Sequence, residues 1–209
     1  MRRRREPLGV VLAGGSGRRM GGSKAIVQLA GTPLIAYPLR AVREALSDVA
    51  IVAKTDTQLP SLPGVTVWIE PDEPRHPLVG IMQALALAEQ RPVLICASDL
   101  PFVTRELVAE LADADPGRAP AVLAASGSNV QPLLGCYQPS ALELLTPLGC
   151  APDRPLRDCI AEIGPVTLEV SDPDLLFNVN TPDDLLQAAA MLDARSPRRN
   201  PTASRPGDR

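Results

Sequence analysis

Aromatic residues, histidine and a large excess of charge are all scarce in this 209-residue sequence. Aromatic side chains make up 2% of the residues, and the formal net charge is -3. Single-stranded nucleic acids are usually bound by stacking aromatic rings and a basic surface, so we expect no nucleic-acid partner. His76 is the only histidine, and no Ser/His/Asp arrangement accompanies it.

Cysteine and long apolar runs are also limited. The four cysteines are scattered and form no CxxC pair, which argues against a disulfide framework or a zinc site and favours a reducing compartment. No apolar run approaches the roughly 18 residues of a membrane-spanning helix. The basic start is followed by an apolar stretch too short for a signal peptide. We therefore expect a cytoplasmic protein without a membrane partner.

The rest of the composition predicts one folded domain with a tail at each end. Hydrophobic residues make up 45% of the chain, enough for a single core. The basic segment 1–6 is expected to be a solvated tail. Residues 195–209 are rich in Pro, Arg and Ser and nearly free of apolar side chains, so we expect them to be disordered. The folded domain then spans residues 7–194.

Within that domain, short apolar runs alternate with longer amphipathic stretches. Strands are expected at 8–13, 49–54, 65–70, 92–97, 120–125, 132–137 and 165–170. Helices are expected at 33–46, 78–90, 104–114, 139–148, 155–163 and 181–194. Continuous apolar runs separated by helices indicate a Rossmann-like three-layer α/β/α sandwich with a mostly parallel sheet. Ligands bind such sheets beyond the carboxyl ends of the strands.

The loop after the first expected strand, residues 14–24, reads GGSGRRMGGSK. Its glycines let backbone N–H groups approach an anion closely, and Arg18, Arg19 and Lys24 add positive charge. This combination suits a polyphosphate. The spacing matches neither the dinucleotide-binding GxGxxG pattern nor the P-loop. A glycine-rich loop with surface arginines is the plain structural alternative.

The segment LAGGSGRRMGGSK resembles the LAGGxxxRMGxxK signature of nucleotidyltransferases. The match falls on Leu12, Ala13, Gly14, Gly15, Arg19, Met20, Gly21 and Lys24. Three later segments, HPLVGIMQAL, CASDLPFV and FNVNTPDDL, resemble the GPLAG, CxxDxPF/Y and FxNxNTPxDL segments of the MobA-like molybdenum cofactor guanylyltransferases. Together these segments span residues 10–185. The chain thus resembles that family along nearly its whole folded part.

The resemblance implies an enzyme that transfers GMP from GTP to the terminal phosphate of molybdopterin and releases pyrophosphate. The acceptor phosphate is already an anion, so the reaction needs no general base and depends on positioning and charge neutralisation. Arg19 and Lys24 would stabilise the charge that passes to pyrophosphate. Nucleotide binding is implied for Leu12, Ala13, Gly14, Gly15, Arg19, Lys24, Asp72 and Asp99.

Asp99 follows the expected strand 92–97, where a carboxylate can hold Mg²⁺ together with phosphate oxygens. By resemblance Asp99 is the metal ligand, acts in catalysis with Arg19 and Lys24, and makes Mg²⁺ the cofactor. A turn residue before Pro101 is the alternative. Contact with the acceptor is implied for His76, Gly80, Asn178 and Asn180. Structural roles are the alternatives: helix packing for Gly80, turn and capping chemistry for the two asparagines.

The choice of base and acceptor stays open, because the sequence departs from the family at two places. Ser23 stands where the family usually has Asp, and Glu70 is followed by Pro71, which leaves Asp72 one position late. Asp72 can accept from a guanine edge or be a solvated turn residue. The alternatives are the same chemistry with CTP, a phosphorylated hydroxy acid or a sugar phosphate, and a nucleotide-binding regulator without catalysis. Enzymes that deliver molybdopterin are the implied partners.

Overall fold

The computed structural model describes residues 5–14, 24–150 and 153–195, and every structural statement below concerns these ranges. Two of the predicted site residues, Gly15 and Arg19, lie outside them. Residues 1–4 and 196–209, which make up most of the two predicted tails, also lie outside the described ranges.

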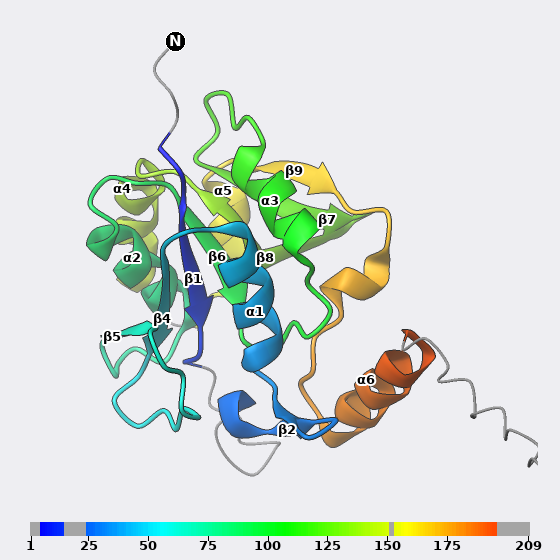
Figure 1. The fold of residues 1–209 in the computed structure, drawn as a ribbon. Coiled ribbons are helices and arrows are strands. Elements are labelled where there is room, and N and C mark those ends of the chain that lie inside the picture. Colours follow the sequence, from blue (N-terminus) through cyan, green and yellow to red (C-terminus); the bar gives the residue numbers. More distant parts are fainter. Residues whose placement is uncertain (1–4, 15–23, 151–152, 196–209) are drawn as a thin grey trace, which may run out of the picture.

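A seven-stranded sheet forms the centre of the molecule, in the order β5-β4-β1-β6-β8-β7-β9 (Figure 1). The strands are β1 Leu8–Leu12, β4 Val49–Ala53, β5 Thr66–Ile69, β6 Val93–Ala97, β7 Ala121–Ser126, β8 Asn129–Tyr137 and β9 Val166–Glu169. Strands β5, β4, β1 and β6 pair in parallel, and β9 is parallel to β7. Only β8 runs antiparallel to its two neighbours among these described strands. The prediction of a mostly parallel sheet is therefore confirmed.

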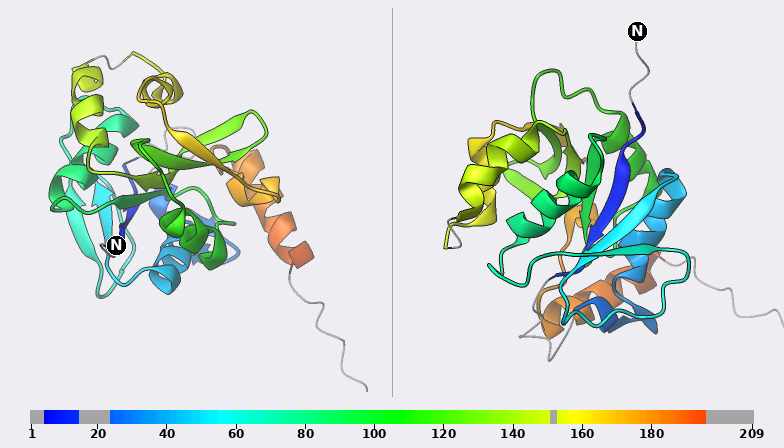
Figure 2. Two further views of the ribbon diagram at one scale, coloured as in Figure 1. Left: turned by 90° about the horizontal axis from the view of Figure 1, so that it is seen from above. Right: turned by 90° about the vertical axis from the view of Figure 1, so that its left-hand side faces the viewer.

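Helices cover both faces of the sheet, as the continuous apolar strands require. The helices are α1 Ala36–Ala45, α2 Pro77–Leu87, α3 Arg105–Asp113, α4 Ala141–Leu145, α5 Leu156–Glu162 and α6 Pro182–Arg195. Because strand side chains alternate between faces, Val11 packs with α1 and α3, whereas Val10 packs with α2, α4 and α5. Figures 1 and 2 show the two helical layers on opposite faces. The predicted three-layer, single-domain α/β/α sandwich is confirmed.

A third, smaller core cluster joins segments from the two ends of the chain. It contains Leu29, Leu34, Phe102, Val179 and Ala188. Leu29 belongs to a short hairpin of β2 (Gln28–Leu29) and β3 (Thr32–Pro33), and Ala188 belongs to α6. The hairpin and α6 lie at the end of the sheet where β1 terminates (Figure 1). This cluster fixes the segment before α6 against the carboxyl edge of the sheet.

The start of α6 is fixed by reciprocal capping bonds. The Asp184 N–H donates to Thr181 Oγ1 at 3.2 Å. In return, Asp184 Oδ2 accepts from the N–H groups of Thr181 at 2.9 Å and Asn180 at 2.8 Å. This capping box agrees with the helix start predicted at Thr181, and it holds the backbone of Asn180 in place.

Two observations concern the expectations about membranes and cysteines. Over residues 5–14, 24–150 and 153–195, no helix is both long and apolar enough to cross a bilayer. In the same ranges, Cys96, Cys136 and Cys159 form no disulfide.

Candidate nucleotide-binding site

A cleft with a volume of about 300 Å³ opens beyond the carboxyl ends of β1, β4 and β6. It lies where ligands bind in sheets of this kind. Six of the predicted site residues line it: Leu12, Gly14, Lys24, His76, Gly80 and Asp99. Lys54, Glu70 and Arg75 also line it, and none of these three was predicted to belong to the site.

At one end of the cleft, Lys24 joins two segments that are distant in sequence. Its Nζ lies 3.0 Å from Asp99 Oδ2 and donates to Asn180 Oδ1 at 2.6 Å. The Val179 N–H donates to the Asp99 carbonyl at 3.0 Å, which ties the loop after β6 to the segment before α6. The Lys24 and Asp99 side chains are 15% and 18% exposed. Both charges are therefore within reach of a ligand in the cleft.

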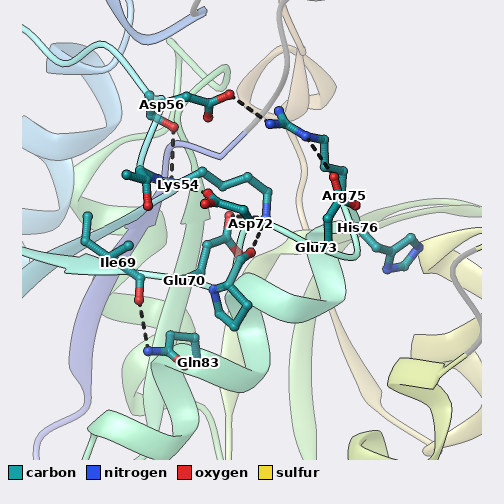
Figure 3. Close-up of polar contacts among 12 residues, drawn as sticks. Lys54, Asp56, Ile69, Glu70, Asp72, Glu73, Arg75, His76 and Gln83 are labelled. Carbon is teal, nitrogen blue, oxygen red and sulfur yellow. Dashed lines mark hydrogen bonds and ion pairs between the residues drawn. The ribbon is translucent and has the colours of Figure 1, made fainter.

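A second lysine–carboxylate pair, Lys54 and Glu70, lies deeper in the same cleft (Figure 3). Lys54 Nζ is 3.5 Å from Glu70 Oε1 and donates to the Pro71 carbonyl at 2.6 Å. The two side chains are only 4% and 5% exposed. Burial raises the pKa of the Glu70 carboxyl, while the charge of Lys54 opposes that rise and the charge of Asp72 adds to it.

The register of the sheet explains why Lys54 and Glu70 meet. Ala53 pairs with Ile69 in the parallel ladder of β4 and β5. The residues that follow them, Lys54 and Glu70, therefore lie side by side. The sequence signal was a single charged residue directly after each of two apolar runs.

Comparison with known proteins identifies the family. The MobA-like NTP transferase domain matches residues 9–166 of the chain. The chain belongs to this family. It is therefore a nucleotidyltransferase, as the sequence predicted.

Individual members of the MobA-like family match nearly the full length of the chain. It is 34% identical over 192 residues to the molybdenum cofactor guanylyltransferase of Ectopseudomonas mendocina, covering 89% of this chain and 93% of that protein. It is 32% identical over 196 residues to the molybdenum cofactor guanylyltransferase of Rhodobacter capsulatus, covering 90% and 98%. The crystal structure of molybdopterin-guanine dinucleotide biosynthesis protein A from Archaeoglobus fulgidus superposes with a TM-score of 0.75 at 26% identity, covering 89% and 98%.

His76 has a structural task in this MobA-like chain. It is the N-cap residue of α2, and its Nδ1 accepts from the Leu78 N–H at 3.2 Å. Its Nε2 lies 2.9 Å from the Arg154 carbonyl, so the partners assign the ring proton to Nε2. Both ring nitrogens are occupied, although the residue lines the cleft.

Asp72 and Asn178 lie apart from the Lys24 cluster. Asp72 is exposed, is not among the residues that line the cleft, and its Oδ1 accepts from the Thr55 N–H at 3.3 Å (Figure 3). Asn178 Oδ1 accepts from Gln131 Nε2 at 3.4 Å. Of the two asparagines flanking Val179, Asn180 is the one that bonds to Lys24.

The oxygens around Lys24 are of the kind that Mg²⁺ takes. Within the part of the chain that the structure describes, no group of three or more His, Cys, Asp or Glu side chains is placed to hold a metal ion. Asp99 Oδ2 and Asn180 Oδ1 both face the Lys24 ammonium, so two hard oxygen donors converge on one positive charge. Mg²⁺ usually takes one or two carboxylates together with phosphate oxygens, and Asp99 fits that requirement.

Proposed function

We propose that this MobA-like transferase moves GMP from GTP to the terminal phosphate of molybdopterin and releases pyrophosphate. The observation that carries the proposal is the Lys24–Asp99–Asn180 cluster at the carboxyl ends of β1 and β6. A cation held beside a carboxylate in an open cleft suits a triphosphate and its metal ion. The substrates, GTP and molybdopterin, are inferred from the names of the relatives, which are molybdenum cofactor guanylyltransferases.

The transfer exchanges one phosphorus–oxygen bond for another. An oxygen of the acceptor phosphate forms a bond to the α-phosphorus of GTP, and the bond from that phosphorus to the bridging oxygen breaks. The electron pair of the broken bond leaves with pyrophosphate. No proton has to move, so the protein contributes alignment and charge. Lys24 neutralises the growing charge on the phosphates.

Asp99 would hold Mg²⁺, with the Asn180 carboxamide oxygen close by. When bound, the metal ion neutralises phosphate charge and polarises the phosphoryl oxygens. The ion pair with Lys24 keeps the Asp99 carboxylate oriented beforehand. Asn180 keeps the Lys24 ammonium at the mouth of the cleft, where it can turn from Asp99 toward the phosphates.

The acceptor and the cellular setting are also part of the proposal. Contact with the acceptor is proposed for His76, which lines the cleft, and for Asn178, which lies two residues before Asn180 and bonds to Gln131. Enzymes that deliver molybdopterin are the expected partners. A reducing, cytoplasmic location is part of the same proposal, because the four cysteines are scattered in the sequence and form no CxxC pair.

Calorimetry with GTP, CTP, ATP and UTP in the presence of Mg²⁺, followed by a transfer assay with molybdopterin, tests the proposal. We expect GTP-selective binding, pyrophosphate release only with the acceptor, and loss of both in Asp99→Asn. Asp48→Asn is the matched control, because Asp48 pairs with Arg91 and lies before β4, at the other end of that strand.

Two results would contradict the proposal. Selective binding of CTP would indicate cytidylyl transfer instead. Binding of none of the four triphosphates, with and without molybdopterin, would remove the nucleotidyl-transfer assignment altogether.

A further inference from the structure

The last residue of α6, Arg195, holds the end of that helix against the segment that leads to Asn180. Its Nη2 donates to Asp172 Oδ2 at 3.3 Å and to Asp174 Oδ2 at 3.1 Å. Asp172 also caps the short 3₁₀ helix η4, Pro173–Leu176, by accepting from the Asp174 N–H at 3.0 Å. One guanidinium therefore joins the C-terminal end of α6 to the turn that begins the segment before it.

The same guanidinium lies over an aromatic ring in the loop after β6. Arg195 Cζ is 4.8 Å from the centroid of the Phe102 ring, a distance at which a cation is attracted to the face of the ring. Phe102 is buried and follows Asp99 by three residues. Its ring meets the Phe177 ring edge-on, with the centroids 6.1 Å apart. Arg195 thus contacts both of the segments that meet at Lys24.

Each of these two segments carries a group that bonds to Lys24. Phe177 lies three residues before Asn180, and the Val179 N–H between them donates to the Asp99 carbonyl at 3.0 Å. Asn180 Oδ1 and Asp99 Oδ2 then both meet the Lys24 ammonium. The placement of these two oxygens therefore depends on how the two segments are held side by side.

Helix α6 has few buried contacts of its own to hold it in place. Within Pro182–Arg195, only Ala188 is buried. Segments with few buried apolar contacts open more readily than the core of a domain. The capping box at Asp184 fixes the first turn of α6, and the contacts of Arg195 fix the last turn. Loss of the guanidinium should therefore let α6 and the segment before it shift against the loop after β6 while the sheet stays folded.

We infer that Arg195 is a positioning residue of the transferase, whose guanidinium keeps Asn180 and Asp99 in the arrangement that lets both bond to Lys24. The inference rests on the proposed function, because it concerns alignment at the same catalytic cluster. Arg195 and its three partners are not among the described residues that line the cleft, so Arg195 acts through other residues and not by touching a substrate. Small displacements of aligned groups slow a reaction that depends on positioning.

Steady-state transfer of GMP from GTP to molybdopterin by the full chain tests the inference. In Arg195→Met, kcat should fall by about tenfold, because the aligned groups are displaced. The KM for GTP, and the Kd for GTP with Mg²⁺ measured by calorimetry, should change by less than about threefold, because the groups that bind the nucleotide are all retained. Arg43→Met is the matched control: Arg43 is exposed and lies in the last turn of α1. It should keep kcat within about twofold of the wild type.

A double variant decides whether Arg195 acts through Asn180. In the Asn180→Ala background the amide partner of Lys24 is gone, so adding Arg195→Met should slow transfer by less than about threefold. A further loss of about tenfold in that background, or wild-type kcat in Arg195→Met alone, overturns the inference. All rates are measured where circular dichroism shows each variant to be fully folded, so that a loss of stability alone does not lower kcat.

A second variant keeps the inference testable if Arg195→Met does not fold. Asp172→Asn/Asp174→Asn removes both charges that anchor the guanidinium, and Asn at position 172 can still cap η4. This double variant must show the same loss of kcat with an unchanged Kd for GTP. Wild-type kcat in it overturns the inference.

Failure of this inference is distinguishable from failure of the proposed function. A wild type that transfers GMP while Arg195→Met transfers it equally fast leaves the transferase assignment intact and refutes the role of Arg195. A wild type that transfers no GMP to molybdopterin refutes the proposed function and the role of Arg195 together.

Discussion

The Lys24–Asp99 and Lys54–Glu70 pairs line the same cleft in different surroundings. The first pair is 15% and 18% exposed, is 3.0 Å apart and includes Asn180 as a third member. The second pair is 4% and 5% exposed and 3.5 Å apart. Charges that water can reach can exchange partners for a ligand at little cost, whereas a buried charge cannot lose its partner without a large penalty. The open pair can therefore exchange its partners for a ligand, whereas the buried pair holds the ends of β4 and β5 together.

The largest effect is expected from removing the open cation. In Lys24→Met, the rate of nucleotidyl transfer should fall by about a hundred- to a thousandfold, because charge developing on the phosphates loses its neutralising group. The free energy of unfolding should change by less than about 1 kcal/mol. Steady-state kinetics and urea denaturation measure the two quantities. Transfer at the wild-type rate would refute the role of Lys24.

The same substitution in the buried pair should reverse this pattern. Lys54→Met leaves the Glu70 carboxylate buried without a cation, so the free energy of unfolding should fall by about 3–5 kcal/mol. Urea denaturation of Lys54→Met and Lys24→Met, side by side, gives the direct comparison. A loss in Lys54→Met no larger than in Lys24→Met would show that the two pairs are equivalent.

Acidification should stabilise the wild type relative to a variant that lacks the buried Glu70 carboxyl. Burial raises the pKa of folded Glu70 above its ordinary value of 4.5, with Lys54 opposing and Asp72 adding to the rise. At pH values between the ordinary pKa and the raised pKa of folded Glu70, the folded state binds more protons than the unfolded state. The wild type should therefore gain stability relative to Glu70→Gln as the pH falls through this window, by at most about 1.4 kcal/mol per pH unit. Below the ordinary value the difference should level off.

Urea denaturation of the wild type and Glu70→Gln at several pH values checks this dependence. A stability difference that shrinks on acidification, or that stays constant, would mean that the carboxyl is not held above its ordinary pKa.

The smallest effect is expected from removing the side chain of Asp184, which caps the start of α6 four residues after Asn180. Asp184→Ala removes the acceptor for the N–H groups of Asn180 and Thr181. Stability should fall by about 1 kcal/mol, as for other lost caps, and transfer should slow only a few-fold because Asn180 becomes less fixed. Asp183→Ala, in the same first turn of α6, is the control. Equal losses in the two variants would show that the capping bonds do not matter.

What could be predicted from the sequence follows from how local each signal is. The sandwich follows from alternating apolar runs and helices, and Thr181, Pro182 and Asp184 mark the start of α6 within a few residues. Strand β8 begins at Asn129, earlier than predicted, because its first residues are exposed or half-buried and are held by pairing with β7.

The rest of the site depends on contacts that no local pattern reveals. Lys54 and Glu70 meet through the register of β4 and β5, which the sequence does not specify. The partner of His76 Nε2 is a carbonyl 78 residues away, at Arg154. Lys24 stands out in the sequence as a cation of the glycine-rich loop and Asp99 as a carboxylate after a strand, but their roles come from the resemblance to a family. Long-range placement, rather than residue type, separates the predicted part of the site from the part found in the structure.

The cluster that joins the β2–β3 hairpin to α6 affects the order in which the protein folds during translation. Lys24 and Asn180 are 156 residues apart, and Asn180 is held by Val179 and the capping box near the C-terminal end of the described chain. Chains emerge N-terminus first and fold as they emerge, so β1, β4, β5 and β6 can assemble while α6 is still being synthesised. Until α6 docks, Lys24 lacks its amide partner. The contact between Lys24 and Asn180 can therefore form only after Asn180 has been synthesised, long after Lys24.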